Sequence, residues 1–320
     1  MKILLVTPAP PGSPSGNRVT ALRWARVLRG LGHRVVIEET YDGRRCDVLV
    51  ALHARRSAAA VRGFHRVWPD APIVVAMAGT DLYRDIHRSA AARRSMALAT
   101  RLIVLQRAGV SALPPRHRAK ARVIYQSARV IASRARVAKR TFDVCVLGHL
   151  RPVKDPFRTA MASRLVPDDS KLRVLHVGAA LSRTMARWAR AESRRNPRYA
   201  WLGALPRWAA LRRLRRCRVL VHTSRMEGGA NVFTEAIASG VPIVSSRIGG
   251  AVGMLGAGYP GYFPVGDTRV LADLLYRAET DARFYARLCT WCRRVMPLIA
   301  PERERRCWAD LLGEVAAVRR

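Results

Sequence analysis

Short apolar runs rich in β-branched residues alternate with longer stretches of helical period along this chain of 320 residues. The apolar runs lie at 3–7, 35–38, 48–52, 73–76, 102–105, 122–125, 143–147, 173–177, 200–202, 219–223 and 243–245. Helical periods occupy 19–31, 57–67, 88–97, 108–113, 156–164, 182–195, 207–215, 232–239, 268–280, 282–296 and 302–319. This alternation predicts the α/β class, with parallel strands and helices on both faces of each sheet.

A single hydrophobic core rarely supports a chain of this length, so two domains are expected. The segment 126–140 is charged and lacks strong periodicity, which is typical of an interdomain linker. Two doubly wound domains are therefore predicted, over 1–140 and 141–300, with ligands at the carboxyl ends of the strands.

The net charge of +36 is large enough to suggest a nucleic-acid partner. However, the basic residues are mostly arginine and are spread over nearly every predicted helix, without a basic tail or an aromatic–basic repeat. This distribution indicates a compositional bias acting on solvated faces, and no specific nucleic-acid partner is expected. Attraction of anionic small substrates is a second explanation of the charge, and a polyanion-binding protein is a third.

No stretch approaches the roughly 20 uncharged apolar residues of a membrane span, so no integral membrane contact is expected. The N-terminal apolar run is interrupted early by proline, so it predicts a first strand and not a secretory signal. A cytoplasmic protein is therefore expected. The six cysteines are scattered, as reduced thiols would be. Cys289 and Cys292 fit packing positions of one helix, and the absence of metal or nucleophile motifs predicts no metal site.

Glu227 and Glu235 bracket the segment EGGANVFTE. Gly228 and Gly229 allow a ligand to approach the backbone, and a helix beginning near Asn231 would point unpaired N–H groups at an anion. Two carboxylates across such a turn are suited to hold sugar hydroxyls on either side of a diphosphate. An ordinary strand–turn–helix junction with surface glutamates is the alternative.

The strand predicted at 143–147 runs into GHLRPVKDP, which places Arg151 and Lys154 at the carboxyl end of the second domain's first strand. An arginine can bind two phosphate oxygens at once, whereas a lysine acts as a point charge. These two cations are predicted to neutralise a diphosphate.

In the first domain, the long proline-rich loop 7–17 leads through Gly16, Asn17 and Arg18 into a helix N-terminus. Backbone N–H groups at such a terminus attract anions. A plain connection between a strand and a helix is usually shorter, which favours a functional loop.

Two more first-domain strands end in polar residues. One ends at His53, Arg55 and Arg56, and the other leads into Thr80 and Asp81. His53 or Asp81 is a candidate to act on an acceptor. Equally, Asp81 fits a helix cap and His53 fits a buried histidine with satisfied hydrogen bonds.

Together, the N-terminal loop, GHLRPVKDP and EGGANVFTEAIASGVPIVSS resemble GT-B glycosyltransferases of the family 4 type. The resemblance implies that Glu235 binds the nucleotide ribose and Glu227 the donor sugar, with Arg151 and Lys154 beside the diphosphate. It also implies an interdomain cleft and a last helix, within 301–320, that crosses back to the first domain. The backbone expected to cradle the diphosphate is that of Gly228, Gly229, Ala230, Asn231 and Val232.

Further motifs, among them TPAPPGSPSGNRVTALRWARVLRGLGHRV, GTDLY and PGYFPVGDT, resemble the selenosugar synthases of selenoneine biosynthesis. That family implies transfer of sugar from UDP-N-acetylglucosamine or UDP-glucose to selenophosphate, followed by loss of phosphate, with no permanently bound cofactor. Selenophosphate is already an anionic nucleophile, so the site must mainly orient it and balance its charge. The residues expected at the acceptor are Gly16, Asn17, Arg18, His53, Arg55, Arg56, Thr80 and Asp81.

For a glycosyltransferase of this kind, the expected catalytic residues are Glu227, Arg151 and Lys154. A family 4 transferase with a lipid or saccharide acceptor is the main rival. Such enzymes usually carry a basic and aromatic amphipathic patch for membrane docking, and no isolated helix of that kind is predicted here.

Overall fold

The computed structural model describes residues 1–13, 15–77, 79–130, 137–138 and 140–317. The chain forms two compact units. The first comprises Met1–Ser127, Glu227–Asn231 and Leu298–Arg320, and the second comprises Ala128–Met226 and Val232–Pro297. The predicted linker, 126–140, lies partly outside the described residues, at 131–136 and 139.

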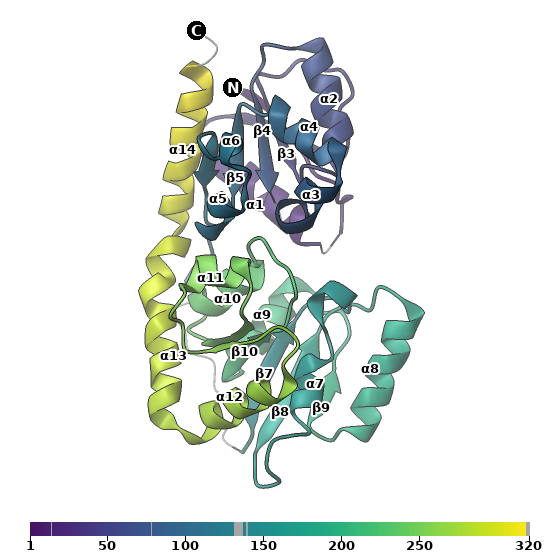
Figure 1. Cartoon of the computed structure of the whole chain (residues 1–320), viewed down its shortest axis with the longest axis vertical. Coiled ribbons are helices and arrows are strands. Elements are labelled where there is room, and N and C mark those ends of the chain that lie inside the picture. Colours follow the sequence, from purple (N-terminus) through teal and green to yellow (C-terminus); the bar gives the residue numbers. More distant parts are fainter. Residues whose placement is uncertain (14, 78, 131–136, 139, 318–320) are drawn as a thin grey trace. The chain divides into compact units, whose positions relative to one another are not determined.

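The first unit holds a six-stranded sheet in the order β2-β1-β3-β4-β5-β6, in which all neighbours are parallel (Figure 1). Its strands are β1 (Lys2–Val6), β2 (Arg34–Glu38), β3 (Val48–Leu52), β4 (Ile73–Met77), β5 (Arg101–Val104) and β6 (Ala121–Val123). Its helical segments are α1 (Gly16–Gly30), α2 (Ala58–Val67), η1 (Asp81–Asp85), α3 (Ile86–Arg88), α4 (Ala90–Leu98), α5 (Ala108–Ala112), α6 (Pro115–Arg118) and α14 (Pro301–Ala317).

Alternate residues of these strands enter two separate cores, because successive side chains of a strand point to opposite faces. Val50 of β3 packs on one face, in the core that contains Trp24 of α1 and Trp308 of α14. Its neighbour Leu49 packs on the other face, with Phe64 of α2. Burial on both faces explains why these strands read as continuous apolar runs.

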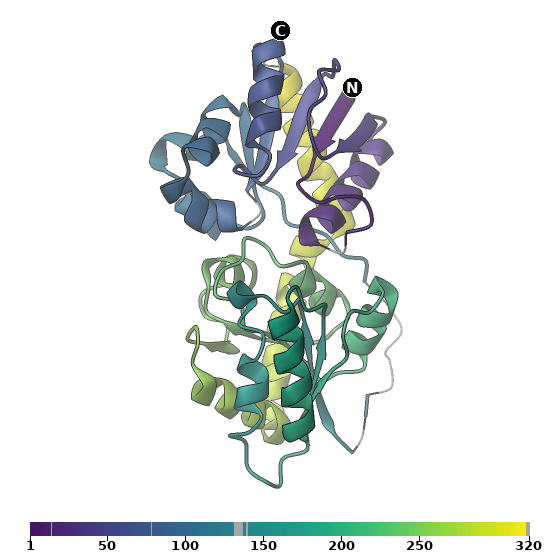
Figure 2. The ribbon, with the colours of Figure 1, turned by 90° about the vertical axis from the view of Figure 1, so that its right-hand side faces the viewer.

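Helix α14, yellow in Figures 1 and 2, closes one of these cores although it comes last in the chain. The rings of Trp24 and Trp308 meet edge to face, with centroids 5.0 Å apart. Trp24 Nε1 also donates to Glu304 Oε1 at 2.9 Å. The first unit therefore takes part of its core from the end of the chain.

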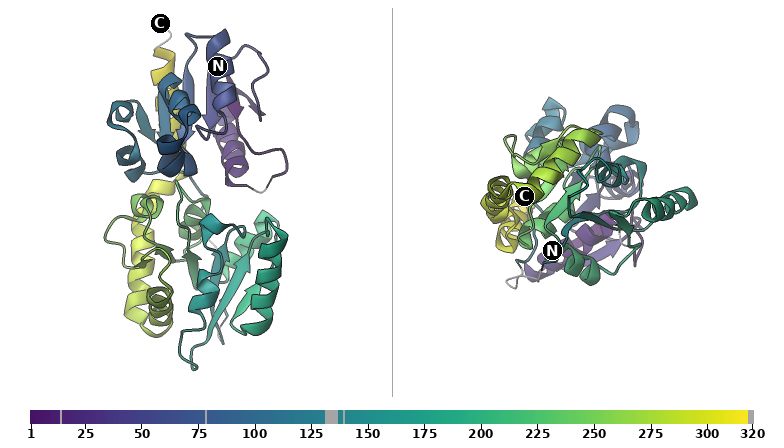
Figure 3. Two further views of the ribbon diagram at one scale, coloured as in Figure 1. Left: turned by 45° about the vertical axis from the view of Figure 1, so that its right-hand side comes forward. Right: turned by 90° about the horizontal axis from the view of Figure 1, so that it is seen from below.

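The second unit holds another parallel six-stranded sheet, in the order β12-β11-β10-β7-β8-β9. Helix α8 lies beside the edge strand β9 (Figures 1 and 3). The strands are β7 (Phe142–Leu147), β8 (Leu172–Val177), β9 (Tyr199–Trp201), β10 (Val219–His222), β11 (Ile243–Ser246) and β12 (Tyr262–Phe263). The helical segments are η2 (Pro152–Lys154), α7 (Arg158–Ala162), α8 (Arg183–Arg195), α9 (Arg207–Arg215), α10 (Asn231–Ala238), α11 (Gly249–Leu255), α12 (Thr268–Thr280), α13 (Ala282–Val295) and η3 (Met296–Ile299).

Each sheet has one point at which the direction of strand addition reverses. It lies between β1 and β3 in the first sheet and between β7 and β10 in the second. In doubly wound sheets, ligands bind outside the carboxyl ends of the strands at this switch point. The topology therefore gives one expected ligand position in each unit.

The predicted α/β class with two doubly wound parallel sheets is confirmed. The strand β12, the helix α11 and the short helical segments η1 and α6 were not predicted from the sequence. β12 has only two residues, too few to show a period, and α11 begins with Gly249 and Gly250, which disfavour helices.

Candidate functional site

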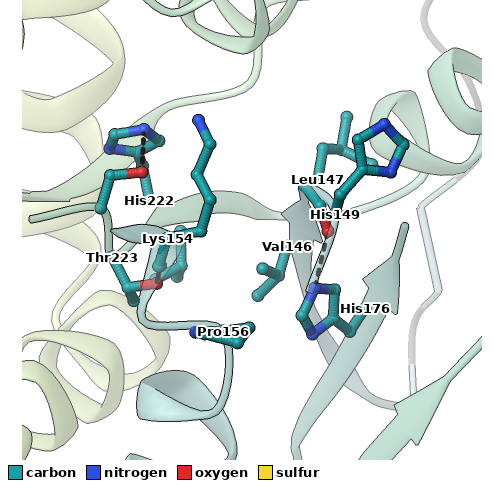
Figure 4. A pocket seen from close by; sticks show the side chains of 11 residues that line it. Val146, Leu147, His149, Lys154, Pro156, His176, His222 and Thr223 are labelled. Atoms are coloured by element: carbon teal, nitrogen blue, oxygen red, sulfur yellow. Dashed lines mark hydrogen bonds between the residues drawn. The ribbon is translucent and has the colours of Figure 1, made fainter. Parts of the chain in front are cut away.

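A pocket lies at the switch point of the second sheet, beside the carboxyl ends of β7 and β10 (Figure 4). Its cavity of about 10 Å³ has room for one water-sized group, such as a single ligand oxygen. The lining residues are Val146, Leu147, Gly148, His149, Lys154, Pro156, His176, Val221, His222, Thr223 and Ser224.

The segment that follows β7 is held in place from two sides by its main chain. Leu150 N donates to Ala179 O at 2.9 Å, which extends the β7–β8 pairing beyond the strands. On the other side, Thr223 Oγ1 donates to the carbonyls of Lys154 and Asp155, at 2.8 and 3.0 Å. The backbone of Lys154 is thereby fixed at the pocket.

The close approach of this segment to β8 requires a glycine. A Cβ on Gly178 would lie 1.9 Å from Gly148 O, far inside contact distance. Because the clashing atom belongs to the backbone, no rotamer change can relieve the overlap. Gly178 therefore allows the floor of the pocket to form.

His149 lies directly after Gly148 and lines the pocket. Its Nδ1 is 3.1 Å from the backbone nitrogen of Ala179, which donates to it. A backbone N–H can only donate, so Nδ1 must carry a lone pair.

His176 and His222 lie deeper, on β8 and at the end of β10, and both are buried. His176 Nδ1 is 2.9 Å from Tyr199 Oη, and Nε2 is 3.1 Å from Gly148 O. Burial lowers the pKa of His176 to about 4. Burial, and then the charge of Lys154, lowers the pKa of His222 well below its ordinary value. Both rings are therefore neutral near pH 7, and Lys154 supplies positive charge at the pocket.

Arg151, predicted beside Lys154, has a different position. It is exposed at the start of η2 and does not line the pocket, whereas Lys154 does.

Glu235 lies in α10 and forms an ion pair with Arg207, the first residue of α9. Arg207 Nη2 is 2.6 Å from Glu235 Oε1, and the two side chains are 58% and 12% exposed. The carboxylate is thus largely buried while its partner remains in solvent.

The turn before α10 contains the other residues predicted to hold the donor. Helix α10 begins at Asn231, in agreement with the predicted start. Gly228 and Ala230 are buried, whereas Glu227 and Gly229 are half-buried. The five residues of this turn, 227–231, belong to the first unit, and Val232 and Glu235 belong to the second.

In the first unit, His53, Thr80 and Asp81 come together at the ends of β3 and β4. His53 adopts a left-handed backbone conformation with φ of 75°, and its Nε2 is 3.0 Å from Thr80 Oγ1. Its Nδ1 accepts a hydrogen bond from Arg56 N at 3.4 Å. Burial lowers the pKa of His53. The ring is therefore neutral and hydrogen-bonded within its own loops.

Asp81 is completely buried. Oδ2 accepts from Ala54 N at 2.9 Å, and Oδ1 accepts from Gly79 N at 2.7 Å and Leu82 N at 3.1 Å. Three backbone N–H groups from two loops thus share this carboxylate. The geometry favours a structural clamp over a residue that exchanges protons with an acceptor.

The predicted acceptor arginines lie on α1 and on the segment after β3. Arg18, in the first turn of α1 after Gly16 and Asn17, is half-buried, and none of the described residues accepts a hydrogen bond from its buried Nε. Arg55 Nε pairs with Asp85 Oδ2 at 2.8 Å. Arg55 and Arg56 are both exposed.

Three histidines and one arginine of this region were not predicted from the sequence: His149, His176, His222 and Arg207. His176 and His222 are single histidines in apolar strands, a pattern more typical of core positions. The only available signal for His149 is its place directly after a strand, next to Gly148.

Over the described residues, no group of three histidine, cysteine or acidic side chains is arranged to hold a metal ion. In the same part of the chain, no helix combines the length and apolar character that a membrane span requires.

One family model matches part of this chain. Residues 131–289 match the family model described as glycosyl transferases group 1. This range contains all residues that line the pocket, as well as Glu227 and Glu235. No curated protein matches the chain in sequence.

Several solved structures share the fold over nearly the whole chain. HepE of Anabaena, in complex with UDP, is 17% identical with a TM-score of 0.77, covering 98% of this chain and 100% of its own. Sucrose-phosphate synthase of Thermosynechococcus elongatus is 14% identical with a TM-score of 0.77, covering 99% of both chains. The lipopolysaccharide outer core galactosyltransferase WaaB is 11% identical with a TM-score of 0.72, covering 98% of this chain and 99% of its own.

At such low identities the likeness shows the fold, and this fold is that of the GT-B glycosyltransferases. Residues 131–289 are similar to the glycosyl transferases group 1 family.

Proposed function

We propose that this protein is a glycosyltransferase that takes its sugar from a UDP-sugar. The observation that carries the proposal is the position of Lys154. Its backbone is fixed at the switch point of the second sheet, within residues 131–289, which match the family model. A cation at this point suits the diphosphate of a nucleotide donor. HepE of Anabaena, which shares this fold, forms complexes with UDP and with UDP-glucose, and this supports the same donor class here.

Within this proposal, Glu235 accepts hydrogen bonds from the ribose, and Glu227 binds the donor sugar. The largely buried carboxylate of Glu235 supports its role, because a buried carboxylate strongly favours partners that donate hydrogen bonds. The backbone N–H groups at the start of α10 add donors for the diphosphate. Lys154 then balances the charge that develops on the leaving UDP, and Arg151 is a second cation beside the donor.

We further propose selenophosphate as the acceptor, with UDP-N-acetylglucosamine or UDP-glucose as the donor. The support is the resemblance of several segments to selenosugar synthases, together with the half-buried Arg18, whose Nε is suited to an anion. In the reaction, selenium attacks the anomeric carbon, and the bond from that carbon to the diphosphate oxygen breaks with its electron pair. Water then cleaves the selenium–phosphorus bond, which yields phosphate and a 1-selenosugar.

Mass spectrometry of the purified protein with UDP-N-acetylglucosamine, with and without selenophosphate, tests both steps. The expected result is release of UDP and a product that carries sugar and the selenium isotope envelope. UDP release with a lipid or saccharide acceptor, and no selenium product, would replace the acceptor and leave the donor assignment in place. Failure to bind any UDP-sugar would overturn the proposed function.

A further inference from the structure

Helix α8 combines basic and aromatic side chains on its solvent face. Its inner face is marked by the buried residues Ala189 and Glu192, and Figures 1 and 3 show the helix at the margin of the second unit. The exposed residues at and just before the helix, here called the α8 surface, are Leu181, Arg183, Arg187, Trp188, Arg190 and Arg194. No such helix was predicted from the sequence, because the burial of Glu192 and the exposure of Trp188 depend on the fold.

The positive charge of the α8 surface is not balanced within the fold. None of the described residues forms an ion pair or a hydrogen bond with the side chains of its four arginines. Glu192 is the only acidic residue of α8, and it is buried and paired with Arg164 and Arg195. The surface therefore offers four guanidinium groups to an anion outside the protein.

Large apolar side chains are exposed among these arginines. Trp188 is 58% exposed, although its ring lies 5.7 Å from that of Phe157, measured between centroids. Leu181, two residues before the helix, is 59% exposed. The α8 surface thus presents apolar area together with unpaired positive charge.

The segment after α7 extends this apolar area. Arg164 joins it to α8, since its Nε and Nη2 lie 3.1 and 2.8 Å from the two carboxylate oxygens of Glu192. On either side of Arg164 in the sequence, Met161 and Leu165 are exposed as well. Exposed apolar side chains on neighbouring elements are typical of an interaction surface.

We propose that the α8 surface docks the protein on an anionic lipid bilayer. Trp188 and Leu181 lie at the level of the headgroups, where a tryptophan ring and a leucine gain from partial burial. The arginines bind lipid phosphates, because their long side chains reach charge while their apolar stems remain at the interface. Docking of this kind goes beyond the proposed function and depends on neither its donor nor its acceptor.

The observations favour a bilayer over two other partners. A single-stranded nucleic acid would bind the arginines and stack on Trp188, but it offers no apolar environment for Leu181 and Leu165. A second copy of this chain would bring its own net charge of +36 to the surface and would be repelled.

Co-sedimentation of the full chain with lipid vesicles tests the proposal. Vesicles of equal parts phosphatidylglycerol and phosphatidylcholine are compared with vesicles of phosphatidylcholine alone, at about 0.15 M salt. We expect binding to the anionic vesicles only. Trp188→Ala should weaken it about tenfold, because the apolar contact of the ring is lost. Arg187→Gln combined with Arg190→Gln should weaken it about 20-fold, since each basic residue near an anionic surface contributes about fivefold.

Helix α9 of the same unit supplies matched controls. Trp208→Ala removes a tryptophan that is 64% exposed, and Arg212→Gln combined with Arg216→Gln removes the same charge from two exposed arginines. These variants should change the affinity for anionic vesicles less than about twofold, a difference too small for a contact with the bilayer. Circular dichroism and thermal unfolding check that every variant is folded.

Equal losses in the α8 and α9 variants would assign vesicle binding to the overall charge of the protein and would overturn the proposal. Unchanged binding of Trp188→Ala, or no binding of the unsubstituted protein to anionic vesicles, would also overturn it. Binding of single-stranded RNA that depends on Arg187 and Arg190, without binding to vesicles, would assign the surface to a nucleic acid instead.

A second measurement applies if Trp188→Ala does not fold. Phosphatidylglycerol with brominated acyl chains quenches the fluorescence of tryptophans that enter the bilayer. Quenching should be found in the unsubstituted protein and in Trp208→Phe, and it should be lost in Trp188→Phe. Equal quenching in the two variants would contradict the proposal.

Discussion

The loops that follow the central strands are held by different contacts in the two sheets. In the first unit, side chains hold the loops together, since Asp81 receives three backbone N–H groups and His53 contacts Thr80. In the second unit, main-chain contacts such as that of Leu150 with Ala179 hold the loop after β7. Polar side chains therefore stabilise the loops of both sheets, but the loop after β7 is held through its own main chain, by Ala179 O and by Oγ1 of Thr223.

The largest expected effect is the loss of stability on replacing Asp81. Asp81→Ala should lower the free energy of unfolding by about 4 kcal/mol, because three backbone N–H groups lose their acceptor and each buried unsatisfied donor costs about 1–3 kcal/mol. Urea unfolding monitored by circular dichroism gives this value. Asp81→Asn, which retains one oxygen, should lose less. A loss below about 1 kcal/mol, together with a large loss of activity, would instead place Asp81 in the chemistry.

Glu235 should show the opposite behaviour. Glu235→Ala should lower kcat/KM for the UDP-sugar about 100-fold, since hydrogen bonds to charged groups contribute about 1.5–3 kcal/mol. Its ion pair is with the exposed Arg207, so the free energy of unfolding should change by less than about 1 kcal/mol. Steady-state kinetics and urea unfolding measure the two quantities.

Glu302→Ala is the matched control for that experiment, because Glu302 is an exposed glutamate of α14. It should leave both the kinetics and the stability unchanged. Near-normal turnover of the Glu235 variant would remove Glu235 from the donor site and would erase the contrast between the two sheets.

A smaller effect is expected from the buried histidine under the pocket of the second unit. The pKa of His176 is about 4 in the folded protein and about 6.5 in the unfolded chain, so between these values the unfolded chain binds more protons. Its contribution to stability is present above pH 6.5 and is lost as the pH falls toward 4. This group alone should lower the free energy of unfolding by about 2 kcal/mol between pH 7 and pH 5.

The pH dependence is measured by urea unfolding at several pH values, for the unsubstituted protein and for His176→Gln. The variant should show a shallower decline, because it lacks the titrating ring. Identical slopes for both proteins would mean that the ring of His176 is protonated in the folded state.

The smallest effect concerns the first unit and the acceptor. Arg18→Ala should raise the KM for selenophosphate about tenfold and change the KM for the UDP-sugar less than twofold, since a charge-assisted contact is lost on one substrate only. Arg26→Ala, at an exposed arginine of the same helix, is the control. Equal effects on both KM values would count against a role of Arg18 at the acceptor.

Much of the fold could be predicted from local sequence, because strands buried on both faces and amphipathic helices leave clear periods. The start of α10 at Asn231 and the position of Lys154 after β7 follow from such local signals. The residues around Lys154 could not be predicted in this way. His222 lines the pocket because β10 pairs with β7. The order of strands in a sheet cannot be predicted from a local sequence pattern.

Contacts between residues far apart in the sequence could not be predicted either. Arg207 meets Glu235 from 28 positions away, and the sequence contains many other arginines. The ring of His149 accepts a hydrogen bond from Ala179 N, 30 positions further along. Lys154 and Glu235 were thus accessible from sequence, whereas the residues around them depended on the tertiary structure.

The docking of α14 on the first unit has a consequence for the synthesis of the protein. The core face that Trp24 and Trp308 share cannot close until residues 301–317 have left the ribosome. Residues 128–300 must be translated in between, which takes on the order of 10–30 s at about 5–20 residues per second. The nascent first unit thus exposes apolar surface while most of the second unit is made, so it is the part of the chain most in need of a chaperone during translation.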